Sequence, residues 1–443
     1  MLKRKIQENL LKWRNSPDRK PLMIIGARQV GKTFIIRNIL FPLYENSVEI
    51  NLVNDEKGPK LFAKIQNLED FFLKVNLYAK KPIKEKKTII FIDEIQHYQN
   101  LDVITLCKFL YEDGRYDYVF SGSLLGNYLY QTTSVPVGFL NILTMYPLDF
   151  EEYLWANGVD DNVLKQIHNN NFRPLIPLDD QVHEYFMSLF RKYLIIGGLP
   201  EAVSIFLKSQ NIFDVQSIHT NIHRLYLIDA SQYARNRTPF INHIYSLIPA
   251  QLGSKTKRFM INKTNKRINY SEASEDYLWL TNAGIVTSLY QVSIPSKPLL
   301  YSKIGSFVKL YLNDCGILTT ILFDQNAGDI LNDLSSINIG SIYECAIANQ
   351  LYPYVKNLTY YDSKKHGEVE FLFEHNNQLT ILEIKSGKNY MIHSAFNYVM
   401  ENKEYKIDQG YILCNKNIHQ RNGRIYLPIY MIIFLLNNNK NQP

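Results

Sequence analysis

The sequence predicts an α/β fold in which the strands of a parallel sheet alternate with helices. An apolar run at residues 22–25 leads through a glycine-containing loop into a helix-like segment at 34–40. Two further apolar runs, 87–95 and 116–123, each end in polar residues, as buried parallel strands do at the carboxyl edge of a sheet. The segments between these runs carry apolar residues at helical spacing. They are residues 57–77 and 101–111. This alternation predicts a parallel sheet covered by helices on both faces.

The loop after the first run has the pattern G-x-x-x-x-G-K-T. Its glycines allow consecutive backbone N–H groups to surround a phosphate, and the following helix adds the positive end of its dipole. Lys32 is expected to reach the β- and γ-phosphates, and the Thr33 hydroxyl to coordinate Mg²⁺. A chance glycine loop does not account for the strand before it and the helix after it. The loop therefore predicts a nucleoside triphosphate site formed by Gly26, Ala27, Arg28, Gln29, Val30, Gly31, Lys32 and Thr33.

The second apolar run ends in the carboxylates Asp93 and Glu94. A buried parallel strand delivers such residues to the sheet edge where ligands bind. We expect Asp93 to hold the Mg²⁺ shell and Glu94 to polarise the attacking water. An ordinary acidic turn is the alternative, and it is disfavoured because the pair follows the phosphate loop by roughly 60 residues.

The third run ends in Ser121, Gly122 and Ser123. Either serine is a candidate to sense the γ-phosphate or the catalytic water. Ser123 also suits the N-cap of a helix that would begin at residues 124–125. Both roles are open, and they are compatible with one another.

These motifs, together with segments further along the chain, resemble those of prokaryotic AAA-type (AAA_14) ATPases that carry a DUF4143 C-terminal region. The resemblance implies ATP and Mg²⁺ as cofactors, and it covers nearly the whole chain. It implies a P-loop ATPase domain at 1–155, a helical lid at 156–252, a winged-helix-like segment at 253–300 and a nuclease-like domain at 301–443. The supporting segments are 92–96, 121–123, 146–152, 197–201, 283–285 and 307–316.

One feature departs from the family pattern. Members often carry an arginine, a candidate arginine finger, where this chain has Gly138 and Phe139, and no arginine occurs between Arg115 and Arg173. A finger typically contributes about 10³–10⁵ in rate. Either turnover is slow or the cation comes from elsewhere. Internal candidates are Arg191, Arg224, Arg235 and Arg237, for which surface ion pairs are the simpler role.

The segment 255–268 is the densest basic patch of the chain. Two helix-like segments and a strand at 285–292 around it fit a winged helix, in which basic side chains neutralise DNA phosphates. A solvated charged face is the equal alternative. The basic residues are Lys255, Lys257, Arg258, Lys263, Lys266 and Arg267.

A second group of chemically active residues lies at 340–390. Strand-like segments place Glu370 and Glu383 on adjacent strands, with Lys385 on the same face as Glu383 and Asn376–Asn377 as a hairpin turn. Two carboxylates can hold Mg²⁺ beside a lysine that steadies phosphoryl charge, and Glu344 can orient the site or share a second metal. This arrangement is similar to the PD-(D/E)xK nuclease fold, with Glu370 where Asp is usual. The alternative is a hairpin with charges on its wet face.

The composition sets wide limits. The 443 residues suggest about three domains, and a net charge of +7 is compatible with nucleic acid without requiring it. The four cysteines are far apart, which disfavours a zinc ribbon and favours buried thiols. No signal-peptide core is evident, and the apolar run 427–436 suits a buried strand, so we expect a cytoplasmic protein without a membrane span.

The sequence thus predicts ATP binding and hydrolysis coupled to a Mg²⁺-dependent nuclease-like module acting on nucleic acid, with DNA favoured. The sequence leaves open whether the protein forms a homo-oligomer. The alternative is a regulatory or assembly ATPase whose nuclease-like scaffold is inactive and whose nucleotide state switches protein binding.

Overall fold

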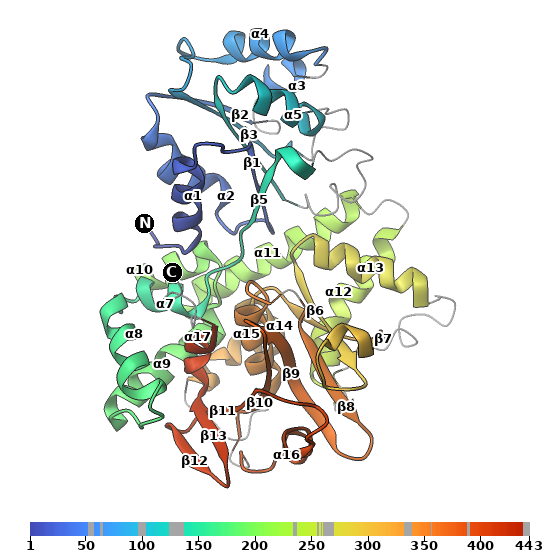
Figure 1. Ribbon diagram of the computed structural model, residues 1–443. Coiled ribbons are helices and arrows are strands. Elements are labelled where there is room, and N and C mark those ends of the chain that lie inside the picture. The colour runs from blue at the N-terminus through green and yellow to red at the C-terminus, as the bar shows by residue number, and fades with distance from the viewer. Residues whose placement is uncertain are drawn as a thin grey trace. The chain divides into compact units, whose positions relative to one another are not determined.

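The computed structural model describes residues 1–51, 57–62, 65–95, 103–123, 137–233, 237–254, 257, 259, 270–331, 339–355, 357–387 and 390–436. The chain forms two compact units, which are described separately. The N-terminal unit comprises Lys3–Tyr146 with Asn282–Gly284, and the C-terminal unit comprises Met1–Leu2, Pro147–Thr281 and Ile285–Pro443. Figure 1 labels their helices and strands.

The N-terminal unit contains a five-stranded sheet in the order β2-β3-β4-β1-β5, and every neighbouring pair is parallel. The predicted parallel sheet is therefore confirmed. The strands are β1 (Leu22–Ile25), β2 (Asn46–Asn51), β3 (Thr88–Asp93), β4 (Asp117–Gly122) and β5 (Asn141–Thr144). The helices described are α1 (Ile6–Asn15), α2 (Lys32–Ile35), α3 (Lys57–Leu61), α4 (Leu68–Tyr78) and α5 (Val103–Asp113).

Strand β3 shows why this sheet forms. All six of its residues are buried, and four of them are isoleucine or phenylalanine. Such continuous apolar strands are typical of parallel sheets with both faces covered. A core that includes Phe71, Val75 and Leu110 from α4 and α5 packs against the central strands. The carboxyl end of β3 is thereby held in a fixed position.

Helices dominate the first half of the C-terminal unit. Asp149 and Glu152 form a complete capping box at the start of α7, which fixes the entry of the chain into this unit. The helices are α7 (Phe150–Ala156), α8 (Asp161–Ile167), α9 (Asp180–Ile196), α10 (Pro200–Ser209), α11 (Ile212–Tyr233), α12 (Thr238–Leu252) and α13 (Tyr270–Asn282). Helix α9 ends before Gly197 and Gly198, and a Cβ on Gly198 would collide with the carbonyl oxygen of Leu148.

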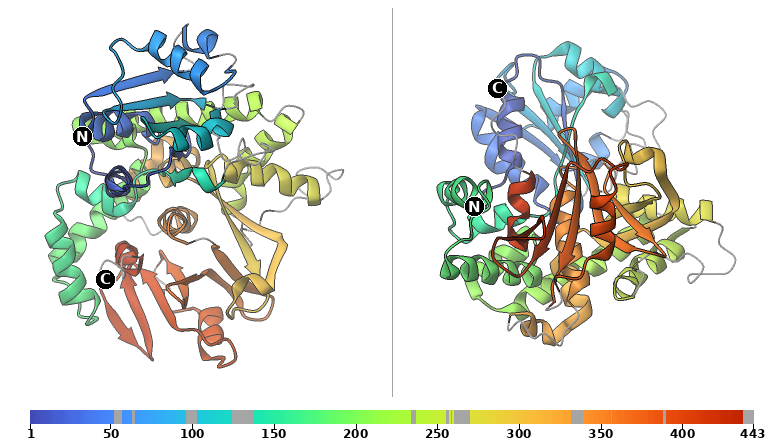
Figure 2. Two further views of the ribbon diagram at one scale, coloured as in Figure 1. Left: turned by 45° about the horizontal axis from the view of Figure 1, so that its top comes forward. Right: turned by 60° about the horizontal axis from the view of Figure 1, so that its bottom comes forward.

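An eight-stranded mixed sheet forms the rest of the C-terminal unit, in the order β12-β13-β11-β10-β9-β8-β6-β7. Its strands are β6 (Val286–Val292), β7 (Lys303–Leu312), β8 (Thr359–Ser363), β9 (Gly367–His375), β10 (Gln378–Lys385), β11 (Gln409–Cys414), β12 (His419–Arg421) and β13 (Arg424–Pro428). The helices among them are α14 (Cys315–Phe323), α15 (Gly340–Leu351), α16 (Ser394–Glu401) and α17 (Ile432–Leu436). Figure 2 shows this sheet curving around α15.

Three sequence expectations bear on this sheet. The hairpin at Asn376–Asn377 is present, with both residues in the left-handed region that its tight turn requires. The strand expected at 285–292 is β6, which pairs with β7 and β8, so the domain boundary placed after residue 300 separates paired strands of one sheet. The buried strand expected at 427–436 is wrong in most of its length, because β13 ends at Pro428, which cannot donate to a ladder, and the chain then becomes helical.

The structure also bears on the expectations for the cysteines and for a membrane span. All four cysteines are buried and free. Within the part of the chain that the structure describes, no helix has both the length and the apolar character needed to cross a bilayer.

Candidate nucleotide site and carboxylate cluster

The phosphate loop joins the end of β1 to the start of α2, and its shape depends on its glycines. Gly26 and Gly31 have φ values of 145° and 96°, which disfavour side-chain-bearing residues. A Cβ on Gly26 would also collide with the carbonyl oxygen of Met145. Helix α2 continues directly into a π-helical turn, Ile36–Leu40. The loop amides therefore precede a helical segment, as the motif predicts.

Lys32 lies within this loop. Its ammonium donates hydrogen bonds to the carbonyl oxygens of Gly26, at 3.0 Å, and Ala27, at 2.8 Å. The side chain is buried. The ammonium is thus held on the loop that is predicted to surround the phosphates.

Thr33 and Asp93, both predicted to hold Mg²⁺, are brought together by the fold. The Thr33 hydroxyl donates to Asp93 Oδ2 at 2.8 Å, and the Ser121 hydroxyl donates to Asp93 Oδ1. Because β4 lies between β1 and β3, Ser121 comes to lie beside Asp93. Burial raises the pKa of Asp93, although the hydrogen bonds from Ser121 and Thr33 oppose this shift.

Glu94 follows β3 in a left-handed backbone conformation, with φ of 55°. The Ser123 hydroxyl donates to Glu94 Oε2 at 3.3 Å. A non-glycine residue held in this region is commonly found where function fixes a side-chain direction. The two candidate sensor serines therefore contact the two predicted catalytic carboxylates, one each. The proposed capping role of Ser123 involves residues 124–125, and Gln96 of the same motif set also lies outside the described residues.

Sequence reasoning missed Arg4, which supports the loop from the N-terminus. Its guanidinium donates to the carbonyl oxygens of Val30, at 3.2 Å, and Tyr146, at 2.7 Å. Arg4 is buried. It stands in a short basic run, Lys3-Arg4-Lys5, and nothing in the sequence distinguishes it from a solvated charge.

The candidate arginine fingers differ in their contacts and exposure. Arg237 makes a two-pronged pair with the buried Asp276, at 3.0 and 2.6 Å, and Arg191 lies 3.8 Å from Glu184. Arg224 is exposed on α11, and Arg235 lies outside the described residues. Both Arg237 and Arg191 form ion pairs, as the simpler alternative proposed, but the Asp276 partner of Arg237 is buried rather than at the surface.

In the C-terminal unit, Glu370 and Glu383 come together across the β9–β10 hairpin. The register pairs Phe371 with Leu382, which places the two glutamates next along the same ladder. The backbone N–H of Ile384 donates to Glu370 Oε2 at 3.3 Å. Glu370 is 8% exposed and Glu383 is 2% exposed, so the alternative of a wet charged face does not hold for this pair.

Charged side chains closely surround Glu370 and Glu383. Lys385 Nζ lies 2.7 Å from Glu383 Oε1, and the buried carboxyl groups of Glu383 and Glu370 also form a hydrogen bond with one another. Burial and the neighbouring carboxylates of Glu383 and Glu344 raise the pKa of Glu370 well above its usual range. Burial alone would lower the pKa of Lys385, but Glu383 and Glu370 raise it. The predicted residues are thus coupled to one another.

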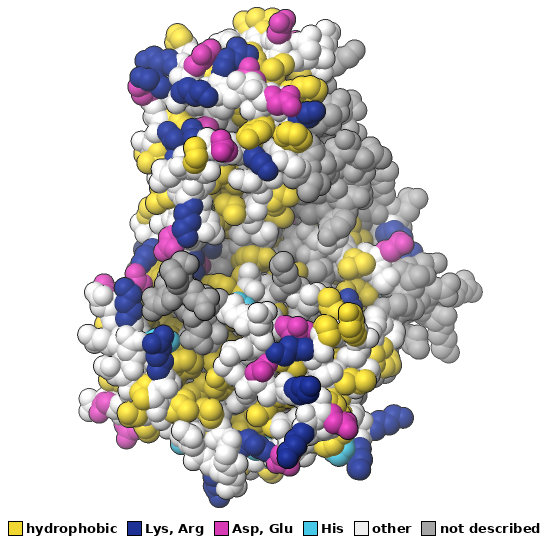
Figure 3. All heavy atoms as spheres, viewed as in Figure 1, with side chains coloured by type: hydrophobic (Ala, Val, Ile, Leu, Met, Phe, Trp, Pro, Cys, Tyr) yellow, Lys and Arg dark blue, Asp and Glu magenta, His cyan; other side chains and the backbone are white. Residues whose placement is uncertain are grey.

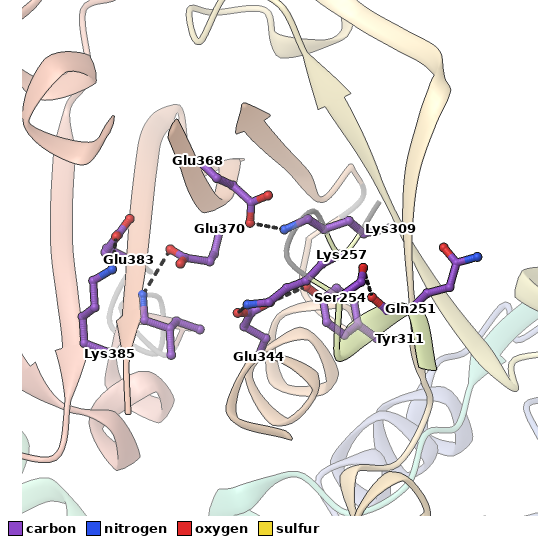
Figure 4. A network of polar contacts seen from close by, with 11 residues as sticks. Gln251, Ser254, Lys257, Lys309, Tyr311, Glu344, Glu368, Glu370, Glu383 and Lys385 are labelled. Atoms are coloured by element: carbon purple, nitrogen blue, oxygen red, sulfur yellow. Dashed lines mark hydrogen bonds and ion pairs between the residues drawn. The ribbon is translucent and has the colours of Figure 1, made fainter. Parts of the chain in front are cut away.

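Glu344 projects from α15 into the same cluster. It forms an ion pair with Lys257 and accepts a hydrogen bond from the Tyr311 hydroxyl at 2.9 Å. Burial would raise the pKa of Glu344, but Lys257 and Lys309 outweigh it and lower the value. Figure 4 shows these side chains in one network of polar contacts.

Lys309 and Glu368 complete this network, and neither is among the site residues predicted from the sequence. Lys309 on β7 is 0% exposed, pairs with Glu368 and lies 4.7 Å from the ring centroid of Tyr360. Burial raises the pKa of Glu368 even though Lys309 opposes the shift. A lone lysine inside the apolar run Phe307–Leu312 was the available signal. We call these residues the carboxylate cluster: Lys257, Lys309, Tyr311, Glu344, Glu368, Glu370, Glu383 and Lys385.

The carboxylates predicted to bind a metal in the C-terminal unit are engaged with other side chains. Among the described residues, no group of three or more His, Cys, Asp or Glu side chains is arranged to hold a metal ion. Two of the carboxylates proposed as ligands, Glu344 and Glu383, are instead in contact with lysines. The basic patch is largely outside the described residues: Lys255, Thr256, Arg258, Lys263, Lys266 and Arg267 are not described.

Family models match three segments of the chain. Residues 18–154 match AAA_14, described as an AAA domain. Residues 187–327 match DUF8612 and residues 339–432 match DUF4143, each described as a domain of unknown function. The chain therefore combines an AAA-type, ATP-binding P-loop domain with a DUF4143 region. The DUF8612 match covers part of the predicted lid, the whole predicted winged-helix-like segment and the first residues of the predicted nuclease-like domain. No curated protein matches the chain.

Several solved structures resemble parts of the chain at low identity. The S. cerevisiae Hsp104–ADP complex is 14% identical, with a TM-score of 0.28, over 62% of this chain and 37% of that chain. C. elegans PCH-2 is 14% identical, with a TM-score of 0.27, over 47% of this chain and 63% of that chain. Drosophila ORC bound to DNA is 12% identical, with a TM-score of 0.27, over 68% of this chain and 89% of that chain. The chain spans less than two thirds of the first two, and TM-scores this low do not bear on function.

Proposed function

We propose that the N-terminal unit hydrolyses ATP with Mg²⁺. The observation that carries this proposal is the contact of Thr33 with Asp93, because the fold joins a hydroxyl and a carboxylate from two separate motifs at the end of the phosphate loop. Both are oxygen donors, the type that Mg²⁺ prefers. When bound there, Mg²⁺ would neutralise charge on the β- and γ-phosphates.

The residues of the site have distinct roles in this proposal. When nucleotide binds, the Lys32 ammonium exchanges its hydrogen bonds with the carbonyl oxygens of Gly26 and Ala27 for contacts with the phosphates. Glu94 accepts a proton from the attacking water, and Ser123 holds the Glu94 carboxylate in position. Ser121 holds Asp93. Arg4 keeps the loop in its phosphate-binding shape.

Lys32→Ala tests the binding step. The variant is expected to bind Mg-ATP roughly tenfold to hundredfold more weakly, because it loses charge-assisted hydrogen bonds of about 1.5–3 kcal/mol. Fluorescent-nucleotide titration measures the affinity, and Lys12→Ala, on the solvent side of α1, is the matched control. Equal affinity in Lys32→Ala and the wild type would remove the basis of this proposal.

We further propose that the C-terminal unit is a Mg²⁺-dependent nuclease-like module that acts on nucleic acid, with DNA favoured. Glu344, Glu370 and Glu383 would hold the metal, and Lys385 would steady phosphoryl charge. The contact of the buried Glu383 with Lys385, beside the buried Glu370, supports this assignment, because one hairpin thereby joins two carboxylates and a lysine. Figure 3 shows basic and acidic side chains interspersed on the face in view, so the proposal depends on this cluster rather than on a basic surface.

A cleavage assay tests the nuclease proposal. Wild-type protein with Mg²⁺ or Mn²⁺ is expected to cut nucleic acid, and Glu383→Ala and Lys385→Ala to lose about 10²-fold or more of that rate. The control is Glu401→Ala, an exposed carboxylate whose ion-pair partner is Arg424 rather than a residue of the carboxylate cluster. Single- and double-stranded DNA and RNA are all assayed. Cutting that survives both substitutions would assign it to a different site.

The alternative, a regulatory or assembly ATPase with an inactive nuclease-like scaffold, is favoured by a different observation. Lys257, Lys309 and Lys385 each contact a carboxylate of the cluster, so its charges are partly balanced by the protein itself. Absence of cutting with every substrate, together with ATP-dependent protein binding, would support this second function.

A further inference from the structure

Strand β2 lies at an edge of the five-stranded parallel sheet, and no strand among the described residues pairs with its outer side (Figure 1). Its register with β3 shows which backbone groups this side presents. The N–H of Asn46 donates to the carbonyl oxygen of Lys87 at 3.2 Å, so Asn46 and every second residue after it face β3. Ser47 and Glu49 therefore point their N–H and C=O groups away from the sheet. No backbone partner for these outward groups is found in the part of the chain that the structure describes.

A groove with a volume of about 830 Å³ follows this open side. Every residue of β2 except Ile50 lines it, so the groove runs along the strand. Its walls come from both faces of the sheet. Phe41 contacts the ring of Phe91, the register partner of Glu49, and so lies on the Glu49 face. Tyr78, at the end of α4, packs against the core on the opposite face.

This geometry fits an extended peptide segment. An added strand would pair its backbone with the outward groups of Ser47 and Glu49, and its alternate side chains would point to the two opposite walls. Apolar surface is available to those side chains, because Leu77 lines the groove and is 69% exposed. The groove thus offers both the backbone pairing and the side-chain contacts of a bound strand.

The charges of the groove favour an acidic segment. Both glutamates that line it are already paired with cations of the chain. The pairs are Glu45–Lys84, Glu45–Lys87 and Glu49–Arg37. Lys80 and Lys81 also line the groove and are exposed, and neither has an ion pair or a side-chain hydrogen bond in the described structure. Uncompensated positive charge therefore remains beside the open edge.

We propose that the open edge of β2 binds an extended, acidic segment of a partner protein by strand addition. An unprotected edge pairs readily with other chains, and the uncompensated lysines restrict which chain can add here. The surface is distinct from the nucleotide site, because the phosphate loop starts from β1, three strands across the sheet. The proposal therefore stands or falls independently of ATP hydrolysis and of the nuclease-like module.

A fluorescein-labelled synthetic peptide of alternating valine and glutamate, about eight residues long, tests the proposal with the full chain. Fluorescence anisotropy measures its affinity. The wild type is expected to bind this peptide at least about tenfold more tightly than the same peptide with lysine in place of glutamate. Methylation of alternate backbone nitrogens keeps the charge and the side chains but prevents strand pairing. The methylated glutamate peptide is therefore expected not to bind.

Two pairs of variants locate the binding site. Ser47→Pro removes an outward N–H while leaving the bonds to β3, because proline is accepted at edge positions whose N–H faces away from the sheet. Its affinity should fall about tenfold or more, whereas Ser47→Ala, which keeps the N–H, should stay within about twofold of the wild type. Lys80→Glu/Lys81→Glu should also weaken binding about tenfold. Lys165→Glu/Lys208→Glu changes the net charge equally, on α8 and α10, and should have no effect.

The outcomes separate the possible occupants of the groove. Circular dichroism establishes that each variant is folded. No binding of the glutamate peptide to the wild type, or equal binding by folded Ser47→Pro and the wild type, would overturn the proposal. If Ser47→Pro does not fold, equal binding of the methylated and unmethylated peptides would overturn it instead. Self-association of the wild type in sedimentation that Ser47→Pro removes would assign the edge to a second copy of the chain, and would also count against an acidic partner.

Discussion

Glu94→Gln is expected to slow ATP hydrolysis by about 10²–10⁴-fold while leaving ATP affinity close to that of the wild type. The substitution keeps the shape of the side chain and a hydrogen bond with Ser123, but it removes the ability to accept a proton from water. Thr33, Asp93 and the phosphate loop are unchanged, so ground-state binding should persist. Single-turnover hydrolysis and nucleotide titration measure the two effects separately.

The matched control is Glu69→Gln, a carboxylate in the first turn of α4, which should not change the rate. Ser123→Ala is expected to fall between Glu69→Gln and Glu94→Gln, because Glu94 then keeps its chemistry and loses one orienting contact. Hydrolysis by Glu94→Gln at the wild-type rate would show that another group activates water. If ATP turnover per wild-type molecule rises with protein concentration, an arginine supplied by a second copy of the chain is indicated.

The nucleotide site could be predicted from the sequence because its signals are local. A phosphate loop needs its glycines, Lys32 and Thr33 within one short segment, and Asp93 and Glu94 end a strand whose apolar run is visible without the fold. What the sequence could not provide was the strand order. Only when β4 lies between β1 and β3 does Ser121 reach Asp93.

The carboxylate cluster could be predicted only in part, because only some of its contacts are local in the sequence. The hairpin relates Glu370 to Glu383 through a short turn, so a period of two and a turn signal were enough. Lys309 reaches the cluster from far away in the chain because β6 pairs with both β7 and β8, and Lys257 lies two residues before the backbone contact of Phe259 with Val308 on β7. No local pattern encodes such contacts. Basic composition left DNA and solvent as equal alternatives for Lys257, and the fold instead supplies Glu344.

Lys309→Met is expected to destabilise the C-terminal unit by about 3–5 kcal/mol near neutral pH, the typical cost of breaking a buried ion pair by removing one partner. Lys309 is fully buried, and its loss leaves Glu368 beside Glu344 without its counter-ion. The double variant Lys309→Met/Glu368→Gln should recover most of the loss, because no uncompensated charge remains. Native-state hydrogen exchange of β7 and β9 peptides measures the local opening free energy without requiring the whole chain to unfold in one step.

The pH dependence of Lys309→Met follows from the sign of the Glu368 shift. Burial already raises the pKa of Glu368 in the folded wild type, and loss of the ammonium should raise it further. A carboxyl group whose folded-state pKa lies above its unfolded-state value favours the folded state most at low pH and loses that advantage as pH rises through the two values. The destabilisation should therefore be largest above the raised pKa and should shrink as the pH falls toward the ordinary range of glutamate. A loss of the same size at low and neutral pH would mean that packing, rather than the stranded carboxylate, accounts for it, and Glu368→Gln alone would then change little.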